Sequence, residues 1–95
     1  MKKNPKLLTA KTLFYNNVLH LKNELDECVE EGMIDENDHY YNELLDLLAA
    51  SELLSNWDEL EDAIEVAKIL EVDVNAWLAL KGRSTVSLEW PLAEP

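Results

Sequence analysis

Apolar residues recur along the first third of the chain with the period of an α-helix. Five of them follow one another at spacings of 4, 3, 4 and 3 residues: Phe14, Val18, Leu21, Leu25 and Cys28. This is the a/d pattern of a helix that buries one narrow face, here called the seam. The pattern follows Pro5 and stops before Gly32, residue types common at helix starts and ends. We therefore expect a first helix over residues 6–31.

A second helix is expected over residues 38–54, after the connection GMIDENDH. Its apolar positions form a broad face: Tyr40, Tyr41, Leu44, Leu45, Leu47 and Leu48. A face this wide predicts that neighbouring elements cover most of the helix. Ser51, Ser55 and Asn56 then weaken the helical signal, because short polar side chains compete for backbone hydrogen bonds. We place a break between the second helix and the next one there.

The third helix is expected over residues 57–71. Its cap is Ser55 or Asn56, and Asp58 or Glu59 is the acidic partner of a capping box. One side of this helix carries an apolar row: Trp57, Leu60, Ile64, Ala67 and Leu70. That row predicts a helix packed against the first two.

A short fourth helix is expected over residues 74–81, capped by Asp73 and ended by Gly82. Its inward residues would be Trp77, Leu78 and Leu80. The stretch IEVAKILEVDVNAWLALKG also resembles the last two helices of a phage-repressor-type helix-turn-helix domain. No basic recognition helix precedes it, so the resemblance implies two packed helices and nothing about DNA.

Near the end of the chain, in STVSLEWP, the apolar residues Val86, Leu88 and Trp90 alternate with polar residues. This is a strand-like period, but a lone strand has no ladder partner within the chain. We expect residues 83–95 to form an extended tail that packs on the domain or on a partner. The predicted fold is thus all-α: one acidic domain over residues 1–82, a compact bundle of three to four helices, followed by this tail.

Charge is distributed very unevenly along the chain. Residues 1–22 contain five Lys and no acid, whereas residues 23–67 contain sixteen acids and no Lys or Arg. Residues 68–95 add three bases and four acids, which gives the net charge of −12. Such a field opposes binding to phosphate backbones and favours basic partners. We expect no direct binding to nucleic acid.

The densest acidic stretch is SNWDELEDAIEV, with five carboxylates at Asp58, Glu59, Glu61, Asp62 and Glu65. The dipole at a helix start stabilises acids in the first turn, so part of this cluster has a structural reason. It does not explain the absence of bases over residues 23–67. The residues expected to contact a partner are Asp58, Glu61, Asp62, Glu65, Glu27, Glu31 and, as an apolar anchor, Trp90.

Two functions agree with this surface. The first is a non-catalytic interaction protein, an adaptor, regulator or inhibitor, that docks a basic surface of a protein partner. The second is a nucleic-acid mimic of the phage anti-defence or nucleoid-regulator type, which would occupy a DNA- or RNA-binding groove. In either case the partner is a basic protein, a class that includes nucleic-acid-binding proteins. The long seam of the first helix is also compatible with a homodimer.

Catalytic and metal-binding patterns are weak in this sequence. The chain has only two glycines, too few for a glycine-rich phosphate-binding loop, and its sequence contains no motif of a catalytic nucleophile. The metal candidates are His20 with Glu24 and a single Glu36-x-x-His39, fewer ligands than a helical dimetal site needs. We expect no enzyme, cofactor or metal. One cysteine, no signal-peptide pattern and no membrane-length apolar run predict a cytoplasmic protein.

Overall fold

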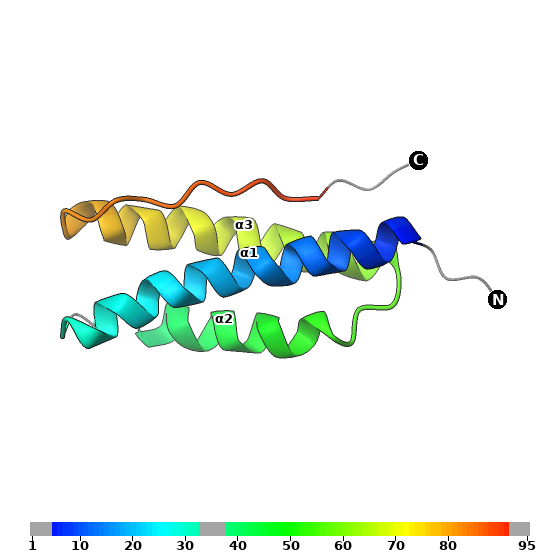
Figure 1. The fold of residues 1–95 in the computed structure, drawn as a ribbon, viewed down its shortest axis with the longest axis horizontal. Helices are drawn as coiled ribbons and strands as arrows, with labels where there is room; N and C mark the ends of the chain where they lie inside the picture. The colour runs from blue at the N-terminus through cyan, green and yellow to red at the C-terminus, as the bar shows by residue number, and fades with distance from the viewer. Residues whose placement is uncertain (1–4, 33–37, 92–95) are drawn as a thin grey trace.

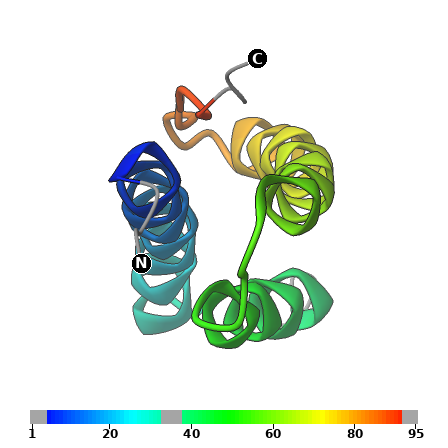
Figure 2. The same ribbon diagram turned by 90° about the vertical axis from the view of Figure 1, so that its right-hand side faces the viewer.

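The computed structural model describes residues 5–32 and 38–91. These residues form three α-helices: α1 (Pro5–Glu30), α2 (Asp38–Ser51) and α3 (Trp57–Leu80). The helices lie side by side in an elongated bundle of 49 × 21 × 16 Å, with α1 and α3 running the same way and α2 running against them (Figure 1). Seen along the bundle, they occupy three corners around a common core (Figure 2). The predicted all-α class is confirmed.

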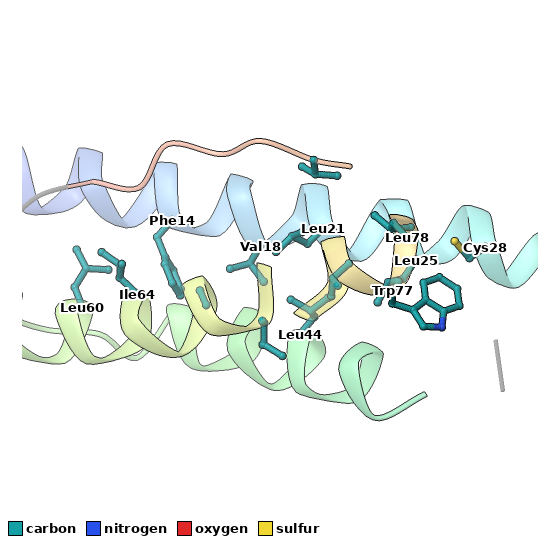
Figure 3. Packing of buried hydrophobic residues seen from close by; sticks show 14 of the residues in the cluster. Phe14, Val18, Leu21, Leu25, Cys28, Leu44, Leu60, Ile64, Trp77 and Leu78 are labelled. Atoms are coloured by element: carbon teal, nitrogen blue, oxygen red, sulfur yellow. The ribbon is translucent and has the colours of Figure 1, made fainter. Parts of the chain in front are cut away.

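The seam of α1 forms the centre of the core. Each of its five members is fully buried, and Leu7 and Ala10 extend the same face toward the helix start. Figure 3 shows that the seam lies along α3, with Phe14 near Ile64 at one end and Leu25 near Leu78 at the other. Because the seam is buried within the chain, a second copy of the protein would have to use another surface.

The predicted ends of the helices follow local chemistry. Gly32, with φ of 83°, lies just beyond α1, where a left-handed residue commonly ends a helix. At the start of α3, the side chain of Asn56 accepts a hydrogen bond from the Glu59 amide at 2.9 Å. Glu59 in turn accepts a hydrogen bond from the Ser55 amide at 2.8 Å. Asn56 is therefore the cap, and Glu59 is its capping-box partner.

The prediction of a separate fourth helix is wrong, because α3 continues without a break from Trp57 to Leu80. Its sequence contains no Gly or Pro, and Val74 and Leu78 continue the buried row of Leu60 and Ile64. Asp73 therefore lies within the helix instead of capping one. The two packed helices that the helix-turn-helix resemblance implies are one helix in the structure.

Two further expectations about burial need correction. Leu80 was expected to face inward, but it is 84% exposed, because it lies on the side of α3 opposite the buried row. Leu45, on the broad face of α2, is also partly exposed. The apolar face of α2 is therefore wider than the area that α1 and α3 cover. α2 ends at Ser51 instead of residue 54, where the Ser51 hydroxyl donates to the Leu48 carbonyl.

The chain reverses direction at the end of α3 through a Schellman motif. Gly82 has φ of 76°, the Gly82 amide donates to the Ala79 carbonyl, and the Arg83 amide donates to the Leu78 carbonyl. These are the two bonds that define the motif. Residues 83–91 then run back beside α1 and α3, on the side away from α2 (Figures 1 and 2).

Side chains of α3 hold this extended segment in place of a β-ladder. Asn75 contacts both backbone groups of Val86: it accepts from the amide and donates to the carbonyl, each at 2.7 Å. Further along the segment, the Glu71 carboxylate accepts hydrogen bonds from the Leu88 amide at 3.1 Å and from the Trp90 indole at 2.9 Å. Val86 is buried in the core between the helices.

Candidate protein-interaction surface

Four acids occupy the outer side of the first half of α3: Asp58, Glu61, Asp62 and Glu65, here called the acidic quartet. All four side chains are exposed. A helix rises about 1.5 Å per residue, so the quartet extends over only about 10 Å of the axis. Within the described residues, none of the four forms an ion pair or a hydrogen bond. The quartet is therefore a compact negative surface with no internal partner.

The fifth acid of the same stretch has a different place. The Glu59 carboxylate accepts hydrogen bonds from the Ser55 amide and hydroxyl, at 2.8 and 3.1 Å. Its role is to cap the start of α3, which explains one acid of the stretch by local structure alone. The sequence left Asp58 and Glu59 open for this role, and only the geometry distinguishes them.

Glu27 and Glu31 do not join the quartet. Glu27 lies in the last turn of α1 and Glu31 directly follows the helix. The end of α1 and the start of α3 are at opposite ends of the bundle (Figure 1). Both are bound by Arg83, through distances of 3.4 Å to Glu27 and 2.5 Å to Glu31. The residues expected to contact a partner thus do not form one surface, and two of them are already neutralised in part by a base that follows α3.

Trp90 is engaged within the chain as well. Its ring lies 5.9 Å from that of Phe14, centre to centre, and its indole N–H donates to Glu71. The side chain is half-buried. Through these contacts, Trp90 anchors the tail of the chain to its own helices.

An exposed apolar row on α3 escaped the sequence reasoning. Ile69, Val72 and Leu80 are 61%, 67% and 84% exposed, and Ala76 between them is exposed too. We call these four residues the apolar stripe. A shallow depression of about 270 Å³ accompanies it, lined by Glu65, Lys68, Ile69, Val72 and Asp73. The signal for the stripe was its own spacing of 3, 4 and 4 residues, on the side opposite the buried row.

Lys22 and Asp26, four positions apart on α1, form an ion pair. In α1, Lys22 lies 2.9 Å from Asp26 and 5.8 Å from the ring centre of Tyr41 on α2. The hydrogen bond between Lys22 and Asp26 raises the pKa of Lys22 and lowers the pKa of Asp26. A hydrogen bond to Asp26 raises the pKa of Tyr41. This cluster joins α1 to α2.

The metal and nucleophile candidates remain scattered. His20 Nε2 lies 3.9 Å from Glu24 Oε2, and Glu36 lies outside the described residues. In the described part of the chain, no three side chains of metal-binding type come together. Cys28 is fully buried, and burial raises the pKa of its thiol, which disfavours the reactive thiolate.

Comparison of the chain with protein-family models, with curated proteins and with solved structures finds no match. Across residues 5–32 and 38–91, no helix combines the length and the apolar character that a membrane span requires.

Proposed function

We propose that this protein is a non-catalytic interaction protein that docks a basic surface of a protein partner through the outer face of α3. The observation that carries the proposal is the acidic quartet, which is exposed and forms no ion pair with any residue that the structure describes. Unpaired surface charge of one sign attracts an oppositely charged partner, raises the association rate and disfavours wrong partners.

Local structure alone gives a weak reason for the quartet. Asp58 and Asp62 are four positions apart on the helix, and like charges at this spacing cost about 0.2 to 0.5 kcal/mol. The helix dipole compensates only in the first turn, and Glu65 lies beyond it. The same chain places a stabilising Lys22–Asp26 pair on α1 at this spacing. The quartet has no such pair, and docking a cationic partner supplies the missing counter-charge.

The arrangement supports docking over nucleic-acid mimicry. A mimic needs a track of negative charge long enough to replace a phosphate backbone. On the outer side of α3 the acids give way after Glu65 to the apolar stripe, and Glu27 and Glu31 pair with Arg83 at the other end of the bundle. An acidic region beside an apolar one is typical of a protein-docking surface.

The test is affinity capture from the native host with three forms of the protein. The first is wild type, and the second reverses Asp58, Asp62 and Glu65 to Lys. The third is a control of equal charge change on exposed or turn residues around α2, with Glu43, Asp46 and Glu52 reversed to Lys. We expect a basic protein with wild type and with the control, and its loss with the α3 variant.

Mass spectrometry identifies the captured protein, and circular dichroism checks that all three forms keep their helices. Equal capture by all three forms, or no basic protein captured by wild type, would contradict the proposal. Competition by DNA for the captured protein would instead favour mimicry.

A further inference from the structure

The outer side of α3 carries a second regular row besides the buried one. Its members follow one another at spacings of 4, 3, 4, 3, 4 and 4 residues: Asp58, Asp62, Glu65, Ile69, Val72, Ala76 and Leu80. We call this set the outer row. From Asp58 to Ala76 it has the a/d spacing of a helix that packs along another helix, and Leu80 follows one turn later. The inner row, from Leu60 through Ile64, Ala67, Val74 and Leu78, has the same period and is buried.

The apolar half of the outer row is left uncovered by every described element. The tail lies beside α1 and α3 (Figure 2), α2 packs against both helices, and Ile69, Val72 and Leu80 remain exposed. Single exposed leucines are ordinary, but a regular apolar row of about three turns on one helix face marks an interaction surface.

Charge around the stripe selects the chemistry of the occupant. Between Trp57 and Leu80, α3 contains seven acids and a single base, Lys68. Glu65, Asp73 and Lys68 line the depression beside Ile69 and Val72, so its charged residues sum to −1. A ligand that covers the stripe therefore lies in a negative field and must itself be cationic to avoid repulsion.

A second copy of this chain does not complement the outer row. In a parallel pair of α3 helices, Asp58 and Asp62 would face their own counterparts. In an antiparallel pair, Asp58 and Asp62 would face the apolar Leu80 and Ala76, which strips water from carboxylates without pairing them. Each copy also carries a net charge of −12. Both alignments are unfavourable, which leaves a different chain as the occupant.

We infer that the outer row of α3 binds an amphipathic basic helix of a protein partner. Leu or similar side chains of this helix cover the apolar stripe, and its Lys or Arg residues contact the acidic quartet. The row from Asp58 to Leu80 is about 33 Å long at 1.5 Å per residue, which sets the ligand at about six turns. The inference rests on the proposed function, since it names the partner's binding element.

The test uses synthetic peptides of about 22 residues, the length of the row. One has Leu at the a and d positions of its first half and Lys at those of its second half, and another has the reverse order. A third replaces Lys by Glu. Titration calorimetry measures the affinity, and circular dichroism measures the helix formed on binding. We expect one of the Leu/Lys peptides to bind and become helical, and the Leu/Glu peptide not to bind.

Two matched double variants locate the binding face. Ile69→Gln with Val72→Gln removes the first two residues of the stripe, whereas Leu8→Gln with Leu53→Gln changes two leucines elsewhere that are 58% and 79% exposed. Gln has a good helix propensity, so α3 should stay folded. We expect about tenfold or greater loss of peptide affinity for the first variant, as for hot-spot truncations, and no change for the second.

The outcomes separate this inference from the proposed function. If reversal of Asp58, Asp62 and Glu65 to Lys abolishes partner binding while Ile69→Gln with Val72→Gln has no effect, docking through charge stands and the helical occupant is wrong. If the Leu/Glu peptide binds as well as the Leu/Lys peptides, both are wrong. A dimer in sedimentation that Ile69→Gln with Val72→Gln dissociates would replace the partner helix by a second copy.

Discussion

Gly82 is the residue on which the path of the tail depends. Its φ of 76° turns the chain back over α3, and an added Cβ would meet no atom within 4 Å. The position therefore requires glycine for its backbone conformation and not for space. In the sequence, a glycine after an apolar helical row already indicated this stop, and the structure adds the direction that the chain takes next.

Replacing Gly82 by Ala should destabilise the protein by about 1 to 2 kcal/mol, the cost of a left-handed conformation for a residue with a Cβ. Urea unfolding measures the change. Ser84→Ala, at an exposed position two residues on, is the control and should leave the stability within about 0.5 kcal/mol. Equal stability of the Gly82 variant and the wild type would mean that the turn is not formed as described.

Asp26 links residue chemistry to pH. Its pKa is lowered in the folded state by the hydrogen bond from Lys22, so its contribution to stability is fully present above its ordinary pKa of 3.8. The contribution is lost as the pH falls through the lower folded value. Because the pair is partly exposed, solvent limits the stabilisation to about 0.5 kcal/mol.

Asp26→Asn should therefore lower the free energy of unfolding near neutral pH and have no effect once Asp26 is protonated in the wild type. At the alkaline end, the contribution of Lys22 is present below its ordinary pKa of 10.5 and lost above the raised folded value. Urea unfolding of both forms at several pH values measures the difference. A difference that stays constant down to the lowest pH would contradict this role of the carboxylate.

At the scale of the elements, the seam, the cap of α3 and the glycine stops were predictable because each depends on residues within a few turns. The continuity of α3 was not. Asp73 looks like a helix cap in isolation, but it lies inside α3, and the nearby Asn75 binds the backbone of Val86, eleven residues later. Pairing of Arg83 with Glu31 spans 52 residues and leaves no local signal.

The tail should separate from the bundle when Asn75 is removed. Asn75→Ala leaves the Val86 amide and carbonyl without partners, a loss of about 1 to 3 kcal/mol for partly buried groups. Hydrogen exchange should then become faster at Val86 and Leu88, while amides in the seam of α1 keep most of their protection. Asn42→Ala, at an exposed position on α2, is the control. Unchanged exchange at Val86 would show that the other contacts of the tail, including the hydrogen bonds of Glu71 to Leu88 and Trp90, hold it without Asn75.

At the scale of the whole molecule, charge and hydrophobicity are arranged along one helix. α3 buries its inner row, and its outer side is acidic at the start and apolar toward the end. The sequence indicated the acids and their lack of counter-charge, but a list of charges does not say which ones share a face. Glu27 and Glu31 were grouped with the quartet for that reason, and the stripe was overlooked because its leucine was assigned to the core.

The most direct test of charge-driven docking is the affinity of the captured partner for three forms of the protein at about 50 mM and about 300 mM salt, where screening differs strongly. The forms are wild type, the Asp58, Asp62 and Glu65 reversal, and the matched reversal around α2. We predict that wild type and the α2 form bind alike, that their affinity falls with salt, and that the α3 form binds far more weakly at low salt. Equal affinities of all three forms at low salt would contradict the account.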